Sequence, residues 1–272
     1  MTTQPILPLS RFVFREFCKA ALVPLLVIEL ALVLLYFWIN GHNQAKAVAT
    51  LEAESIAHLR EIVGDQSRIL GEQLTAVQSL AQILQQETRR FFTTPDLQLP
   101  PSAPAPQFAV ADNGIFYQTN NTGGGSLYYS ARTSIGAAEQ AKASRSAVLD
   151  PVYQSIYQAN KNIVAIYLNT HDSMNRYIPF IEQVYSQYLP EMNIPEFNFY
   201  YLADAAHNPG KGPVWTETYL DPAGQGWMMS CDAPIYRGDF LEGEAGIDLT
   251  VKKGLDNILT LTRPWDAQAF LV

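Results

Sequence analysis

Residues 20–39 are almost entirely apolar, and this run constrains the chain more than any other feature. Only Glu29 interrupts it with a charge. At a rise of about 1.5 Å per residue, about 20 helical residues cross a hydrocarbon layer of about 30 Å. We therefore expect a transmembrane helix over residues 20–39, with a short segment before it and the bulk of the chain behind it.

The charges beside this run predict its orientation. Arg11, Arg15 and Lys19 precede it closely, whereas Lys46 is the only basic residue over a similar distance behind it. Short loops rich in Lys and Arg stay on the cytoplasmic side of a membrane. Residues 1–19 are thus expected to be cytoplasmic, and the rest of the chain to be exported.

A cleaved signal peptide is the alternative interpretation, because Ala45, Lys46 and Ala47 match a small-residue cleavage site. The apolar run is longer than the usual apolar region of a signal peptide, about 7–15 residues, which favours an uncleaved anchor. Glu29 is costly at the bilayer centre. It could be protonated, reach toward the interface, or face a partner helix in a dimer, and the sequence leaves these alternatives open.

The exported part is acidic. Residues 40–272 carry 15 of the 18 basic and 24 of the 26 acidic side chains, a net charge of −9. This balance argues against nucleic acid and polyanions as partners, and it is compatible with a cationic or zwitterionic small molecule. Cys18 and Cys231 are expected on opposite sides of the membrane, so they cannot pair within one chain. We expect no metal site and no cofactor.

Residues 40–92 are predicted to form one long stalk helix. Apolar residues recur there at every seventh position: Ile56, Val63, Leu70, Val77, Leu84 and Phe91. The other core positions of the heptad are partly polar, so the pattern is typical either of a weak coiled coil or of a helix packed partly on its own domain. Direct continuity with residues 20–39 favours a signalling stalk and a homodimer formed through it.

Behind the stalk, the five prolines of residues 93–107 predict an extended connector. The pattern from residue 108 to residue 262 predicts one module of the α+β class, and residues 263–272 look like the start of a second, truncated module. Strands are expected at 114–119, 126–131, 162–169, 197–202, 212–219, 226–236, 243–251 and 266–272. Helical segments are expected at 137–161, 181–188 and 254–261.

Three ordered motifs carry a resemblance to a known family. They are Val214-Trp215-Thr216 with Tyr219-Leu220-Asp221, then Ala233-Pro234-Ile235-Tyr236, then Gly243-Glu244-Ala245-Gly246-Ile247-Asp248-Leu249. With them, residues 162–259 resemble the double Cache family of PAS-like extracytoplasmic sensors. The resemblance implies a membrane-distal PAS-like module in the periplasm, anchored in a bacterial inner membrane. It also implies a kinase, cyclase or chemoreceptor output region further along the chain.

The resemblance also implies a ligand site. Family members that bind amino acids hold the carboxylate with an arginine-x-tryptophan-tyrosine element and the amine with aspartates. The corresponding stretch here is Phe197-Asn198-Phe199-Tyr200, in which Phe197 replaces the arginine. Without that donor, a buried ligand carboxylate has no charged partner. The expected ligand is therefore an amine or another ligand that is not an amino acid. The predicted ligand-binding residues are Tyr200, Trp215, Tyr219, Asp221 and Asp248.

Each of these residues has a plainer interpretation. Aromatic side chains on strands are usually core, an outward Asp248 would be mere surface, and Asp221 could serve only a turn. Glu242 and Glu244 beside glycines are expected to form a solvated edge. The alternative function is accordingly a membrane-anchored interaction or structural module, without a small-molecule pocket and with an exposed apolar face.

An enzymatic function finds no support in the motifs, and we expect no catalytic residues. His171-Asp172-Ser173 contains the residue types of a hydrolase triad, but neighbours on an extended chain point apart and cannot form a relay. Neither a G-x-S-x-G turn nor an H-E-x-x-H helix occurs in the sequence.

Overall fold

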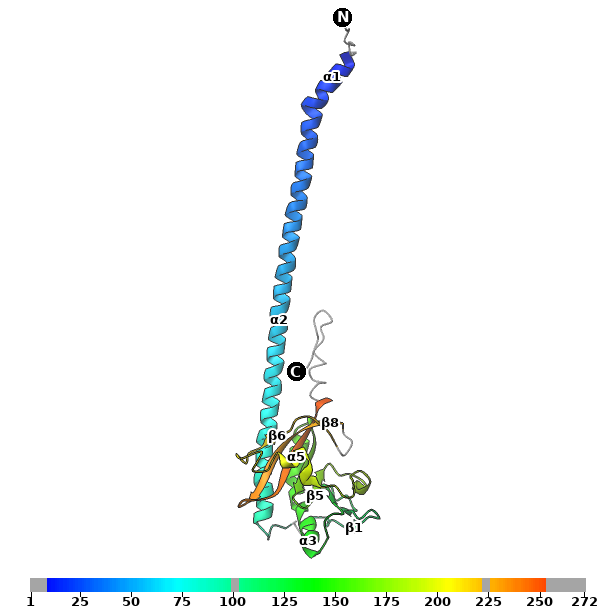
Figure 1. The fold of residues 1–272 in the computed structure, drawn as a ribbon, viewed down its shortest axis with the longest axis vertical. Helices are drawn as coiled ribbons and strands as arrows, with labels where there is room; N and C mark the ends of the chain where they lie inside the picture. The colour runs from blue at the N-terminus through cyan, green and yellow to red at the C-terminus, as the bar shows by residue number, and fades with distance from the viewer. Residues whose placement is uncertain (1–8, 99–102, 222–225, 253–272) are drawn as a thin grey trace. The chain divides into compact units, whose positions relative to one another are not determined.

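The computed structural model describes residues 9–98, 103–221 and 226–252 and divides the chain into two units, residues 1–67 and 68–272. From residue 9 onward, the first unit is helical (Figure 1). It contains α1 (Leu9–Phe17), the π-helical η1 (Cys18–Leu22) and the beginning of α2 (Val23–Thr93). The most apolar 18-residue stretch of this N-terminal helical segment has a mean hydropathy of 2.5, and none of it is buried. The predicted N-terminal apolar helix is therefore confirmed.

The second unit combines the end of α2 with a mixed set of strands and short helices. Its helices are α3 (Ala137–Ser146), η2 (Ala147–Leu149), α4 (Asp150–Ala159), η3 (Val184–Ser186), η4 (Ile194–Glu196) and α5 (Asn198–Tyr201). Its strands are β1 (Phe108–Val110), β2 (Phe116–Gln118), β3 (Ser126–Tyr129), β4 (Ile163–Thr170), β5 (Met174–Ile178), β6 (Val214–Trp215), β7 (Tyr219–Leu220), β8 (Trp227–Arg237) and β9 (Phe240–Thr250).

The strands form one antiparallel sheet in the order β1-β2-β3-β5-β4-β9-β8-β6, with β7 paired to β8. The predicted α+β class is thereby confirmed. The helix expected at 254–261 and the strand expected at 266–272 lie outside the described residues.

Side chains alternate between the two faces of this sheet, as a pleated backbone requires. On β9, Ala245 and Ile247 belong to the main apolar core, whereas Glu244, Gly246 and Asp248 face the other way. The same alternation runs through β4, β5 and β8, so one face of the sheet is apolar and the opposite face is polar and aromatic.

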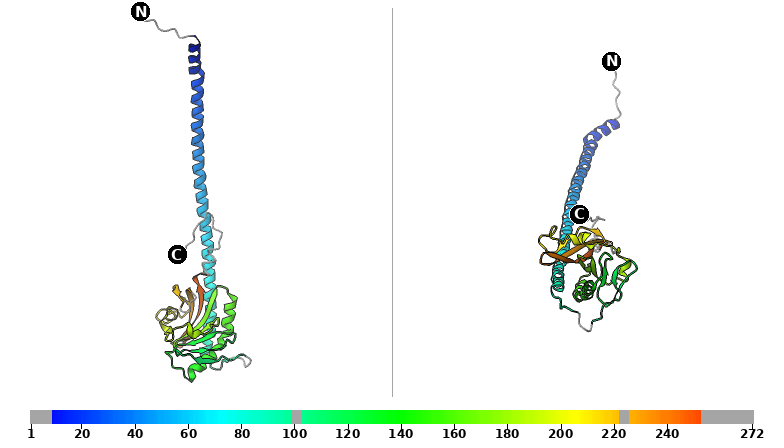
Figure 2. Two further views of the ribbon diagram at one scale, coloured as in Figure 1. Left: turned by 90° about the vertical axis from the view of Figure 1, so that its right-hand side faces the viewer. Right: turned by 60° about the horizontal axis from the view of Figure 1, so that its bottom comes forward.

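Helices lie against the sheet (Figure 2). Val77, Leu84 and Phe91 of α2 are buried in the main core on the apolar face, together with residues of α3 and α4. These positions belong to the seven-residue stripe, so within the second unit the stripe packs on its own domain. In the first unit, Ile56 and Val63 of the same stripe remain exposed.

Two predictions are wrong, and two strands were not predicted. Residues 198–201 form helix α5 instead of the strand expected at 197–202, and strands β1 and β5 were not expected. The aromatic residues of 197–202 are β-prone, but the backbone N–H of Tyr201 donates to the carbonyl of Phe197 at 3.0 Å, and burial outweighs local preference. Glu242 and Glu244 are buried, not a solvated edge, because β9 lies between β4 and β8 in the middle of the sheet.

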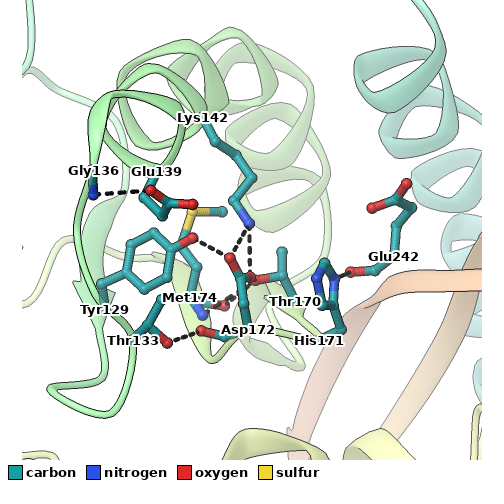
Figure 3. A network of polar contacts seen from close by, with 10 residues as sticks. All are labelled: Tyr129, Thr133, Gly136, Glu139, Lys142, Thr170, His171, Asp172, Met174 and Glu242. Atoms are coloured by element: carbon teal, nitrogen blue, oxygen red, sulfur yellow. Dashed lines mark hydrogen bonds and ion pairs between the residues drawn. The ribbon is translucent and has the colours of Figure 1, made fainter.

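A polar network fixes the turn between β4 and β5 (Figure 3). The Asp172 carboxylate accepts hydrogen bonds from Lys142 Nζ, at 2.6 and 2.7 Å, and from Tyr129 and Thr170. Burial raises the pKa of Asp172, but these hydrogen bonds outweigh it and the net pKa is lowered. His171 instead lies 3.2 Å from the carbonyl of Glu242, so adjacent His171 and Asp172 form no relay.

Candidate ligand-binding site

A pocket that is partly open to solvent lies on the polar face of the sheet. Its lining residues are Tyr128, Tyr167, Asn169, Asn175, Tyr177, Tyr188, Met192, Ile194, Phe199, Tyr219, Asp221 and Asp248.

Strand register brings the floor of the pocket together. Tyr167 lies opposite Tyr177, and Asn169 lies opposite Asn175, where β4 pairs with β5. Asp248 comes from β9, two residues beyond the Gly246 that pairs with Tyr167. The connection between β5 and β6 supplies four further lining residues, including Phe199. One face of the sheet and one long connection therefore build the pocket.

Asp248 is held firmly at one end of the pocket. Its Oδ1 accepts hydrogen bonds from Ser230 Oγ at 2.6 Å and from the Tyr219 hydroxyl at 3.4 Å. Burial raises the pKa of Asp248 to about 7, and the charge of Asp221 adds to the rise, although the hydrogen bonds oppose it. A carboxyl group with this pKa is poised to ionise when a cation arrives.

Two further carboxyl groups lie buried behind the pocket. Asp232 Oδ1 is 3.0 Å from the Tyr167 hydroxyl, and the Tyr167 ring covers Gly246 so closely that an added Cβ would lie 2.3 Å from Cζ. Burial raises the pKa of Asp232 and of Glu244 well above the ordinary range, and neighbouring carboxylates raise both further. These environments favour the neutral carboxyl forms.

A chain of amide hydrogen bonds leads from Glu244 into the pocket. Asn169 Nδ2 donates to Glu244 Oε1 at 2.6 Å, and Asn175 Nδ2 donates to Asn169 Oδ1 at 2.7 Å. The remaining amide oxygen, Asn175 Oδ1, is buried and has no hydrogen-bond partner among the described residues. Buried polar atoms without partners are rare in folded proteins, and this one belongs to a pocket-lining residue.

The structure brings together three of the five predicted site residues. Tyr219, Asp221 and Asp248 line the pocket. Tyr200 is buried beside it in the aromatic cluster around Phe199, without lining it. Trp215 packs against the main core on the opposite face of the sheet. The ligand role of all five stays a prediction.

The other nine lining residues were not predicted, although a pattern in the sequence marks some of them. Tyr167 and Asn169 alternate with Ile166 and Leu168, which belong to the core. Aromatic and amide side chains at every second position of a buried strand indicate that the second face of the sheet is also shielded from solvent, but by polar and aromatic groups. Tyr188, Met192 and Ile194 lie on the irregular connection, where no such periodicity exists.

The ionisable side chains that line the pocket are all acidic among the described residues. Among the described residues that line it, two are carboxyl-bearing and none is Lys, Arg or His. Across the described part of the chain, no group of three His, Cys, Asp or Glu side chains is arranged to hold a metal ion. The arrangement thus offers carboxylates, tyrosine rings and amide groups, which together suit an organic cation.

Comparisons with known proteins give structural neighbours only. No protein-family model matches the sequence, and no curated protein matches it. One similar structure is the sensory domain of the Campylobacter jejuni chemoreceptor Tlp3 with isoleucine bound, at 13% identity over 74% of this chain and 62% of that chain, with a TM-score of 0.42. Another is the ligand-binding domain of the Pseudomonas aeruginosa chemoreceptor PctB with L-Arg, at 16% identity over 71% of this chain and 56% of that chain, with a TM-score of 0.40.

The Pseudomonas fluorescens chemoreceptor CtaA gives a third similar structure, its ligand-binding domain in complex with L-valine. The identity is 20%, the match covers 42% of this chain and 47% of that chain, and the TM-score is 0.33. The chain thus spans 62% of the Tlp3 domain and 56% of the PctB domain.

Proposed function

We propose that this chain is the extracytoplasmic small-molecule-sensing region of a bacterial inner-membrane receptor, of the double Cache type, and that its ligand is an amine without a carboxylate. The observation that carries the proposal is the pocket: Asp221 and Asp248 line it beside several tyrosine rings, and no basic residue lines it among the described residues. The alternative, an interaction module without a ligand, does not call for such a pocket.

The chemistry of the lining explains why an amine is favoured over an amino acid. An ammonium group gains from a carboxylate and from the faces of tyrosine rings. A ligand carboxylate would meet two carboxylates with no Arg, Lys or His beside them among the described lining residues, which costs several kcal/mol in a site withdrawn from water. Amino acids should therefore bind far more weakly than amines of the same length.

The sheet supplies a route from the pocket to helix α2. Asp248 faces the pocket, and its neighbour Ile247 lies in the core that buries Val77, Leu84 and Phe91 of α2. A ligand that prefers one position of β9 would bias the packing of α2, which continues toward the apolar segment. Signalling of this kind requires two states with different ligand affinity.

The test is a binding screen on the full chain in detergent, with primary amines, amino acids, dicarboxylates and purines as probes. A bound ligand at about 100 times its dissociation constant stabilises the folded state by about 2.7 kcal/mol, which raises the melting temperature measurably. We expect stabilisation by amines and little by the corresponding amino acids. Stabilisation by amino acids or dicarboxylates alone would contradict the proposal.

The pH dependence of amine binding gives the same test a second readout. Because burial raises the pKa of Asp248 to about 7, a cation that needs the ionised carboxylate must displace a proton below that pH. The ammonium group stays charged, since its pKa is about 10. Affinity should thus rise by up to about tenfold per pH unit below 7 and level off above it. Calorimetry in two buffers of different ionisation enthalpy would detect the released proton.

We further propose that residues 1–19 are cytoplasmic, that the sensor module is periplasmic, and that α2 forms a homodimer. Ile56 and Val63 remain exposed on the stripe of the first unit, which supports a second copy as the covering partner. Sedimentation of the full chain in detergent should give twice the 30.3 kDa protein mass of one chain. A monomer at all concentrations would contradict the homodimer.

A further inference from the structure

The pocket has polar groups at two separate levels of the sheet. Asp248 marks one level on β9. Asn169 marks the other, because it lies opposite Glu244, four residues before Asp248 on the same strand. Four residues of an extended strand span about 13 Å. Asn175 extends the second level, since it lies opposite Asn169 on β5.

The hydrogen-bond chain decides which atom the second level presents to a ligand. Asn169 Nδ2 donates to Glu244 Oε1, which accepts this bond both in an ionised carboxylate and in a neutral carboxyl group with its proton on Oε2, and Asn169 Oδ1 accepts from Asn175 Nδ2. The amide of Asn175 is oriented in turn, with Oδ1 as its free end. This oxygen is an acceptor without a donor among the described residues, and Asn175 as a whole is only 7% exposed. A ligand that supplies a donor there would satisfy it.

Between the two levels the pocket is aromatic. Tyr167 and Tyr177 stack in parallel with ring centroids 6.4 Å apart, and Tyr167 also meets the edge of Phe199 at 6.4 Å. All three residues line the pocket. Such a surface favours a hydrocarbon segment of a ligand over a polar one.

We propose that the ligand of this site is a linear diamine-type cation with a hydrogen-bond donor at each end. One ammonium group binds between Asp221 and Asp248, the hydrocarbon segment lies along the tyrosine rings, and the second amino group donates to Asn175 Oδ1. The inference rests on the proposed amine-sensing function and adds Asn175 as the residue that selects two-ended ligands.

The experiment compares ligands that differ only in the second donor. Isothermal titration calorimetry on the full chain in detergent uses putrescine, cadaverine, hexamethylenediamine and spermidine, each against an alkylamine of matched length. A buried hydrogen bond from a charged donor should favour the best diamine over its monoamine by roughly tenfold or more. Affinity should peak at one chain length, because both ends must reach their acceptors together.

Two variants assign the effect to Asn175. In Asn175→Leu, which keeps the approximate side-chain volume, the advantage of the diamine should disappear while monoamine affinity stays within about twofold. In Asn175→Asp the acceptor is kept and charged, so the advantage should persist or grow. The Asp variant also keeps the test decisive if the Leu variant fails to fold.

The possible failures are distinguishable. Equal affinities for diamines and monoamines in the unchanged protein would overturn the two-ended ligand and leave the amine sensor standing. An equal loss of both ligands in Asn175→Leu would overturn the selecting role of Asn175. An absence of binding by every amine would overturn the proposed function itself.

Discussion

Replacing Asp150 by alanine is expected to lower the free energy of unfolding by about 3–5 kcal/mol, the cost of leaving a buried charge without its partner. Asp150 Oδ1 accepts from Arg176 Nε at 2.6 Å, and its Oδ2 accepts from a second guanidinium nitrogen. The Arg176 side chain is fully buried, and in the variant its guanidinium group would keep a hydrogen bond of 3.3 Å to Ser146 Oγ but lose its charged partner. Since domains are stable by only about 5–15 kcal/mol, this loss could unfold the protein at moderate temperature.

Urea titration of the full chain in detergent, followed by tryptophan and tyrosine fluorescence, measures this change. The matched control is Glu72→Ala, which removes an exposed carboxylate 3.0 Å from Arg68 on α2. Exposed ion pairs contribute less than about 1 kcal/mol, so the control should unfold at nearly the same denaturant concentration as the unchanged protein. Equal effects of the two substitutions would contradict the assignment of Asp150 and Arg176 as a buried pair.

A second substitution separates the cost of an unpaired charge from the value of the pair itself. Replacing Asp150 and Arg176 together by Leu and Met leaves no charge behind in the apolar face. Buried ion pairs are often matched in stability by apolar residues of similar size. The double variant should therefore regain much of the stability lost in Asp150→Ala, unless Gly124, whose backbone packs directly on the Asp150 carboxylate, requires that group.

Replacing Asp248 by asparagine is expected to weaken amine binding by about 30-fold or more, which corresponds to the 2–5 kcal/mol lost when one partner of a buried charge pair is removed. The substitution keeps the size of the side chain and its hydrogen bond from Ser230 Oγ. Calorimetry with the best amine of the screen measures the loss. Asp112→Asn is the control, because Asp112 is exposed and does not line the pocket.

Stability gives an independent check on the Asp248 variant. The pKa of Asp248 is raised by burial to about 7 in the folded protein, against 3.8 in the unfolded chain. The folded state therefore holds more protons between these values, and its stability falls as pH rises through this window. Asn cannot ionise, so above pH 7 the ligand-free variant should melt no lower than the unchanged protein. A variant that loses both binding and stability would indicate a purely structural role for Asp248.

The sequence predicts those parts of the fold that regular repetition encodes. The seven-residue stripe predicts α2, and β4, β8 and β9 follow from long β-prone runs. Short helices and strands are harder to predict, because a few residues are too few to show a repeating pattern of apolar positions. Helix α5 contains four residues, all with β-prone or neutral neighbours, and it packs against strands β8 and β9, which are distant in sequence.

The site is predictable only where a motif marks it. Asp221 and Asp248 follow from the order of the motifs, but the buried state of Glu244 depends on β9 lying inside the sheet, which a local pattern does not reveal. The role of Asn175 is even harder to predict from the sequence. Its amide is oriented by a hydrogen-bond chain through Asn169, which requires that β5 and β4 have paired.

The alternation of the strands has an evolutionary consequence. On β4, core residues alternate with pocket-lining residues. Ile166 and Leu168 pack in the core on one face, and Tyr167 and Asn169 line the pocket on the other. Substitutions at every second position can then alter selectivity while the helix-covered core keeps its packing. A scaffold of this kind can diversify its chemical preferences by small steps, and engineered versions could be retuned by exchanging only the pocket-facing residues of β4 and β5.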